Sequence, residues 1–190
     1  MSAGRIFVFS APSGAGKSTI LRHLAETVPD LVYSISATTR KPRAGETDGV
    51  HYFFMTNEEF EAKAAKGEFA EWQQVFGNYY GTPRAFIDSV VAAGRHIIMD
   101  IDVFGKKKFD LAYPDAVGIL IVPPSIEELA ARLWARGTDD EATIKLRLEK
   151  ARTEMAFARS DGKYEYEIVN DDLETAEAET AALIRTIIGG

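Results

Sequence analysis

The sequence has 190 residues, of which 46% are hydrophobic and 27% are charged, and its formal net charge is −7. This size and composition predict one folded domain, and the negative charge argues against a general nucleic-acid binder. The chain has no cysteine, which excludes disulfides, thiol catalysis and thiolate metal sites, and its three histidines are far apart. No basic-then-apolar leader and no apolar run of about 20 residues is found. We therefore expect a cytoplasmic protein without membrane partners.

The first expected elements surround a glycine-rich loop. An apolar strand over residues 5–10 leads into "APSGAGKST", which is followed by a helix from about Lys17 to Val28. The loop has the spacing G-x-x-x-x-G-K-[ST] of a phosphate-binding loop, except that Ala11 fills the first glycine place. Glycines let backbone N–H groups face an anion, Lys17 adds a positive charge, and Ser18 adds a hydroxyl that can bind Mg²⁺. The alternative is a glycine-rich turn that only caps the helix.

Residues 31–82 predict a compact insert of short strands with one helix. "LVYSISATTR" alternates as a strand does, and "VHYFF" predicts a further strand. Thr56 and Glu59 have capping-box spacing and predict a helix that stops at Gly67. "EFAEWQQVFGNYYGT" predicts two strands around a turn. Since adjacent strand residues face opposite ways, we expect one of Tyr79 and Tyr80 in a core and the other in a site.

After the insert, strands and helices alternate. Helices are expected over residues 83–93, from Ser125 to Gly137, over 138–160 with Thr138 and Glu141 as a capping box, and from about 172 to 188. "HIIMDID", "VGILIVPP" and "YEYEIVN" predict strands. This alternation predicts an α/β fold with a mostly parallel sheet covered on both faces and a site at the carboxyl ends of the strands. The loop, the pair Asp100 and Asp102, and Asn170 all lie at such ends. The lysine run 106–108 is interpreted as a solvated face.

Several spaced motifs together resemble one known family. "SAPSGAGKST", "SATTRKPRAGETDGVHYFF", "EFAEW", "GNYYGT", "DID" and "IVNDDL" follow one another as in guanylate kinases, over about residues 4–188. The resemblance implies a P-loop NTPase-type parallel sheet flanked by helices, and Ala is common in the family at the position of Ala11. It also implies a core over about 1–33, 84–125 and 160–190, a nucleoside-monophosphate-binding insert over about 34–83, and a helical lid over about 126–159.

The implied reaction is Mg²⁺-assisted, in-line transfer of the γ-phosphoryl group of ATP to GMP, and to dGMP, in purine nucleotide metabolism. Implied ATP-binding residues are Ala11, Pro12, Ser13, Gly14, Ala15, Gly16, Lys17, Ser18, Thr19 and Asn170. Implied catalytic residues are Lys17, Arg40, Arg132, Arg136 and Arg147, and the implied Mg²⁺ residues are Ser18 and Asp100. Two alternatives stay open: the lid arginines could form a solvated basic face, and Asn170 could be a turn residue that caps the last helix.

The implied GMP-binding residues are Ser36, Arg40, Arg43, Tyr52, Glu71, Tyr80, Gly81, Thr82, Asp100 and Asp102. Their chemistry fits independently of the resemblance. Arg40 and Arg43 lie in an extended segment where both guanidinium groups can converge on one dianion. Glu71 can accept hydrogen bonds from the N1–H and N2–H₂ groups of guanine, whereas adenine offers an acceptor at N1. The alternative for Glu71 is an exposed acid of a strand.

Two other functions compete with this one. The first is a non-catalytic interaction module that binds phosphopeptides, and Lys17, Ser18 and the arginines disfavour it. The second is a kinase for another monophosphate such as AMP, and Glu71 with Ser36 and Thr82 disfavours it. The sequence leaves open whether the protein is a monomer or a homo-oligomer.

Overall fold

The computed structural model describes residues 4–75, 77–137 and 139–189. The elements occur in the order β1 (Ile6–Ser10), α1 (Lys17–Thr27), β2 (Leu31–Tyr33), β3 (Ala37–Thr38), β4 (Phe53–Phe54), α2 (Asn57–Ala65), β5 (Phe69–Val75), β6 (Asn78–Pro83), α3 (Arg84–Ala92), β7 (His96–Asp100), α4 (Val103–Ala112), β8 (Val117–Val122), α5 (Ile126–Arg136), α6 (Glu141–Ser160), β9 (Tyr166–Val169) and α7 (Leu173–Gly189). In this part of the chain, no helix is long and apolar enough to cross a membrane.

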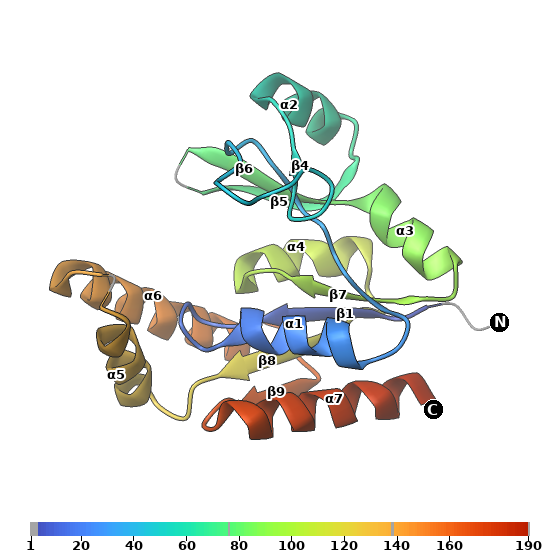
Figure 1. Cartoon of the computed structure of the whole chain (residues 1–190). Coiled ribbons are helices and arrows are strands. Elements are labelled where there is room, and N and C mark those ends of the chain that lie inside the picture. Colours follow the sequence, from blue (N-terminus) through green and yellow to red (C-terminus); the bar gives the residue numbers. More distant parts are fainter. Residues whose placement is uncertain (1–3, 76, 138, 190) are drawn as a thin grey trace.

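The main sheet has five parallel strands in the order β2-β7-β1-β8-β9. Side chains alternate across β1, so that Phe7 and Phe9 pack with α1 and α7, while Val8 packs on the other face with residues of α3 and α4. Figure 1 shows these two helix pairs on opposite sides of the sheet. The predicted α/β fold with a parallel sheet covered on both faces is therefore confirmed.

A second, smaller sheet has the order β4-β3-β6-β5 and mixes parallel and antiparallel pairs. It has its own core around Phe60 of α2, whose ring stacks on Phe69 at 4.3 Å and on Tyr79 at 5.2 Å between centroids. The segment "LVYSISATTR" contributes to both sheets: β2 pairs with β7 in the main sheet, and β3 pairs with β4 and β6 in the small one. Strand β5 packs against α4 and so joins the two parts.

The helix starts follow the predicted capping chemistry with one exception. Thr56 and Glu59 form both bonds of a capping box, and the Ser125 hydroxyl accepts a hydrogen bond from the Glu128 amide. Thr138 lies outside the described residues, but α6 is capped by Asp140, whose carboxylate accepts from the Thr143 amide at 2.8 Å. The expected cap at 138 is therefore wrong, because the acceptor has to precede the first helical residue directly.

Helix α4 was not expected, and it changes the interpretation of the lysine run. Lys106 is 1% exposed, donates to both carboxylate oxygens of Asp110 at 2.9 and 2.8 Å, and lies 4.9 Å from the centroid of the Tyr164 ring. Lys107 and Lys108 are exposed. A solvated face is thus wrong for Lys106, because helical spacing gives its ammonium group a carboxylate partner one turn away and the packed Tyr164 covers it.

Candidate active site

The loop between β1 and α1 lines a pocket of about 380 Å³, which we call the phosphate-loop pocket. Gly14 and Gly16 adopt φ values of 99° and 89°, which side chains with a Cβ atom disfavour. No side chain in the described part of the chain caps α1, and its first turn holds no acidic residue. The helix N-terminus therefore presents its N–H groups and positive dipole end to the pocket. Ala11 lines the pocket and packs against the main core.

Asn170 holds the loop in place from the far end of the chain. Its side-chain amide is buried and donates to the Ala15 carbonyl at 2.8 Å. A Cβ atom at Gly16 would lie 2.3 Å from the same amide nitrogen, so this close approach requires glycine. The cap of α7 is Asp172, which accepts from the Thr175 amide. The capping alternative for Asn170 is therefore wrong, whereas its contact with an adenine ring stays a prediction.

A second pocket of about 320 Å³, the insert pocket, lies between the small sheet and the end of β7. It is lined by the predicted residues Ser36, Tyr52, Glu71, Tyr80, Gly81, Asp100 and Asp102 and by Lys17, Tyr33, Ser34, His51, Gln73, Val75 and Ile101. Tyr80 faces this pocket and Tyr79 packs on Phe60, as expected for neighbouring strand residues. Lys17 and Asp100 line both pockets and form an ion pair where the pockets meet.

Glu71 and Asp102 are fixed at the inner wall of the insert pocket. Glu71 is buried and accepts a hydrogen bond from the Thr82 hydroxyl at 2.7 Å. Burial raises the pKa of Glu71 to about 7, against the opposing effect of that hydrogen bond. Asp102 caps α4 by accepting from the amides of Phe104 and Gly105, and its other oxygen accepts from the Gln73 side chain. Asp102 is thus bonded to two backbone amides and to Gln73, whereas Glu71 is the carboxylate available to a ligand.

Arg40 does not line the insert pocket but lies next to Tyr52, which does, and it is held by a carboxylate that sequence reasoning missed. Both terminal nitrogens of Arg40 donate to Glu46 at 2.9 Å, and the Arg43 amide donates to the same carboxylate at 2.7 Å. These bonds to Arg40 and Arg43 lower the pKa of Glu46 to about 2. The Arg40 guanidinium also lies 5.3 Å from the centroid of the Tyr52 ring. The Arg43 side chain is exposed and does not line the pocket.

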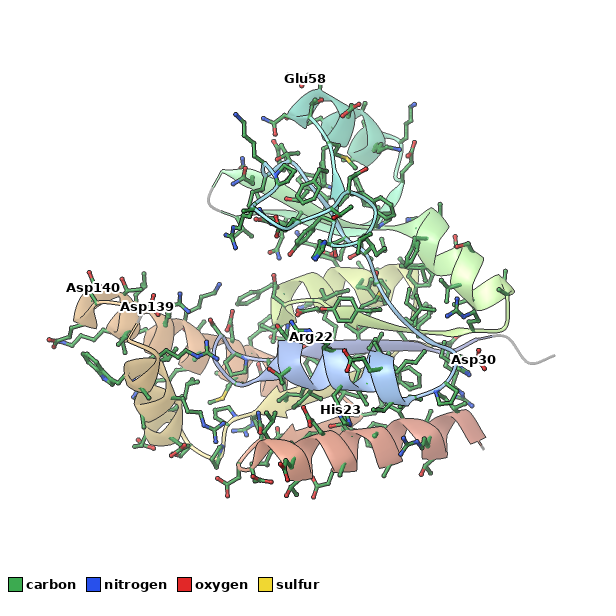
Figure 2. The ribbon with its side chains drawn as sticks, viewed as in Figure 1. Arg22, His23, Asp30, Glu58, Asp139 and Asp140 are labelled. Carbon is green, nitrogen blue, oxygen red and sulfur yellow. The ribbon has the colours of Figure 1, made fainter. Side chains whose placement is uncertain are left out.

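Helices α5 and α6 lie beyond the loop that joins β1 to α1 (Figure 1), with Asp139 and Asp140 near their outer end (Figure 2). Arg136 lines the phosphate-loop pocket, and Arg147 donates to the Ser13 hydroxyl at 3.3 Å. Arg132 is not among the residues that line this pocket; it pairs with Glu128 and donates to the carbonyls of Asn170 and Asp171 at 2.7 and 2.8 Å. The structure thus brings two of the three predicted arginines to the loop. Glu154 of α6, which the sequence did not single out, lines the same pocket.

This sheet, its phosphate loop and the two adjoining pockets define a P-loop nucleotide-binding protein. A family model described as Guanylate kinase matches residues 3–187. The chain is 46% identical to the guanylate kinase of Symbiobacterium thermophilum, covering 95% of this chain and 84% of that one. It is 46% identical to the guanylate kinase of Carboxydothermus hydrogenoformans, covering 97% and 89%. The crystal structure of guanylate kinase from Anaplasma phagocytophilum superposes with a TM-score of 0.75 at 35% identity, covering 97% and 86%. The chain belongs to the guanylate kinase family.

Proposed function

We propose that the phosphate-loop pocket binds ATP, that the insert pocket binds GMP, and that the phosphoryl group passes between them beside Lys17. The activity that goes with the family is ATP-dependent phosphorylation of GMP to GDP. The observation that carries the assignment of the pockets is their shared boundary, because Lys17 and Asp100 line both. A donor and an acceptor phosphate bound on either side of one lysine satisfy the main demand of this chemistry, which is alignment with charge neutralisation.

In the proposed complex, Glu71 and Thr82 recognise guanine, with Ser36, Gly81 and Asp102 beside them. The Glu71 carboxylate would accept from N1–H and N2–H₂ of the base. Because the side chain is buried and bonded to Thr82, a base that offers an acceptor there would leave the ionised carboxylate facing a lone pair, so the discrimination is strongest above the pKa of about 7. This pairing favours GMP over AMP, and it does not involve the ribose 2′-hydroxyl, so that we include dGMP as an acceptor.

The GMP phosphate is assigned to Arg40, Arg43, Tyr52 and Tyr80, and the transfer step to Lys17 with Arg132, Arg136 and Arg147. Guanidinium and phenol groups supply donors for a dianion. Arg136 and Arg147 already reach the phosphate-loop pocket or its rim. A change of contacts at Arg132 would be needed before it met a nucleotide. Residues 11–19 would hold the ATP phosphates, and Asn170 would lie near its adenine.

We assign Mg²⁺ to Ser18 and Asp100. Both line the phosphate-loop pocket, where a hydroxyl and a carboxylate provide the oxygen donors that this ion prefers. Bound there, the ion would neutralise charge on the ATP phosphates. Asp100 would be available for this role once Lys17 turned from it toward a phosphate, because in this structure that ammonium is its ion-pair partner.

The proposed division of the chain follows the two pockets: a core over about 1–33, 84–125 and 160–190, an insert over about 34–83 and a lid over about 126–159. We place the reaction in the cytoplasm, where both substrates are available, with ATP and GMP as the partners and without a role for nucleic acid. The mass of the protein in solution, measured by light scattering, distinguishes a monomer of 20.9 kDa from a homo-oligomer.

The test of this function is ADP formation from MgATP with GMP, dGMP, AMP and UMP in parallel. We expect turnover with GMP and dGMP and far less with AMP and UMP. An absence of turnover with GMP contradicts the enzyme assignment. Faster turnover with AMP than with GMP contradicts the assignment of the insert pocket to guanine.

Replacing Glu46 is expected to weaken GMP binding through Arg40. In Glu46→Ala the guanidinium loses the two bonds that fix it, so KM for GMP should rise by about tenfold or more, as misplacement of a positioning group does. Steady-state kinetics with GMP varied at saturating ATP measure this. Glu68→Ala is the matched control, because Glu68 is also on the insert but pairs with the exposed Lys63. An unchanged KM for GMP in Glu46→Ala would show that Glu46 is not needed to position Arg40.

The raised pKa of Glu71 predicts a pH dependence of GMP binding. The group binds a proton below about pH 7 in the free protein, whereas guanine needs the carboxylate. KM for GMP should therefore rise as the pH falls, by up to about tenfold per unit below the pKa. Kinetics from pH 6 to 8.5 measure this, and Glu71→Gln, which cannot titrate, separates it from ionisation of the GMP phosphate. Parallel pH profiles of the two proteins would contradict the assignment.

A further inference from the structure

Glu154 is a buried carboxylate with too few partners. Its side chain is 7% exposed, and Oε1 lies 3.5 Å from Nζ of Lys150, a residue that is itself 62% exposed. Within the described residues, Oε2 has no hydrogen-bond partner. Burial raises the pKa of this group, as is typical of a carboxylate removed from water without full compensation. Such a group lowers the stability of the free protein unless a ligand completes its bonding.

The position of Glu154 identifies the side of the site that it serves. It lines the phosphate-loop pocket together with Asp100 and Arg136. Arg147 stands seven residues earlier on α6, so the two side chains share one face of the helix, and Arg147 contacts Ser13 at the beginning of the loop. Lys17, which lies where the two pockets meet, lines the same pocket as Glu154. One face of α6 thus places the cation of Arg147 and the anion of Glu154 next to the phosphate loop.

The chemistry of the missing partner follows from charge. ATP alone would repel a carboxylate, and Lys17 already has Asp100. A donor that arrives with the nucleotide would complete the bonding of Oε2, which lies in a carboxylate that lines the pocket proposed for ATP. A magnesium ion that binds ATP phosphates keeps several of its water molecules, and these water molecules are hydrogen-bond donors suited to a carboxylate.

We propose that Glu154 binds Mg²⁺ of the MgATP complex through a metal-bound water, as a second carboxylate beside Asp100. The inference rests on the proposed assignment of ATP to this pocket. It makes the lid helix α6 selective for the metal complex: Arg147 meets the phosphates and Glu154 meets the ion. Free ATP lacks the donor and would leave the carboxylate unpaired next to an anion.

The test compares binding of the non-hydrolysable analogue AMP-PNP, by calorimetry, with Mg²⁺ and with EDTA. In Glu154→Gln we expect the Mg²⁺-dependent gain in affinity to fall by about tenfold, as losses of outer metal partners do, with metal-free binding unchanged or tighter. Glu149→Gln makes the same change at an exposed position of α6 and should keep the full gain. Glu154→Asp keeps the negative charge and should therefore keep most of the Mg²⁺-dependent gain in affinity.

Two results would overturn the inference. The first is an equal Mg²⁺ gain in Glu154→Gln and Glu149→Gln. The second is an equal fall with and without Mg²⁺, which would assign Glu154 to Lys17 or to the fold. Thermal unfolding adds an independent readout. If the carboxylate serves a ligand and not the fold, Glu154→Gln should unfold at the same temperature as the wild type or at a higher one. A clearly lower unfolding midpoint contradicts the inference. If the wild type binds no analogue at all, the ATP assignment fails instead.

Discussion

Lys17→Ala is expected to lower GMP-dependent ADP formation by about 10³-fold or more, the effect of removing a main electrostatic group from a transition state. The ammonium group lies where the two pockets meet, and its only ion-pair partner among the described residues is Asp100. Without it, the transferring phosphoryl group loses a positive charge and Asp100 is left unpaired beside an anion. Steady-state kinetics with GMP and MgATP measure the loss.

Two further variants make the Lys17 prediction specific. Lys17→Met keeps most of the side-chain volume and should lose as much activity, because the charge is what matters. Lys145→Ala removes an exposed lysine that pairs with Glu141 and should keep wild-type activity and stability. Circular dichroism and thermal unfolding should show that the Lys17 variants remain folded. Activity within tenfold of the wild type in Lys17→Ala would refute the proposed role.

Glu71→Ala is expected to lower kcat/KM for GMP by about 10³-fold while KM for ATP stays close to that of the wild type. The physical reason is that the carboxylate is the acceptor for two guanine donors at the inner wall of the insert pocket, away from the phosphate loop. Kinetics with each substrate varied at saturation of the other separate the two effects. Equal losses toward GMP and ATP would contradict a role in base recognition.

The isosteric variant tests which base the pocket reads. In Glu71→Gln the side chain gains an amide donor that can meet N1 of adenine, so the preference for GMP over AMP should narrow. The Thr82 hydroxyl bonds Oε1 in the wild type and can still donate to the amide oxygen, which keeps the side chain in place. Glu68→Ala, next to β5 but exposed and paired with Lys63, should keep the wild-type preference. An unchanged preference in Glu71→Gln would assign base selection to other residues.

Features encoded within a few residues of chain were predictable. Gly14 and Gly16 adopt the positive φ values that the loop pattern requires, and Thr56 forms its capping box with Glu59. Helix α4 is harder to predict for a local reason too: Asp102 both lines the insert pocket and caps this helix. An Asp at a strand end serves either role, and the sequence pattern does not separate them.

Partnerships across the chain were not predictable. Lys106 is buried because Tyr164 packs over it, and Arg40 is fixed because the loop turns Glu46 back onto it. The sequence predicts neither contact, because each depends on which surfaces the fold brings together. Glu154 is the clearest case, since on sequence alone it is one of several acids along a polar helix.

The sequence by itself determined the phosphate loop, the alternation of strands and helices and the family, because each is written in local spacing or in the order of motifs. Alanine in place of the first glycine of the loop pattern is compatible with a phosphate loop, since the Ala11 side chain packs on the core where the strand leaves the sheet. Only the tertiary structure decided that Lys17 and Asp100 line both pockets and that the Asn170 side chain donates a hydrogen bond to Ala15, 155 residues earlier in the chain. The physical reason is that these contacts form when parallel strands align their carboxyl ends, which brings residues from distant parts of the chain to one edge.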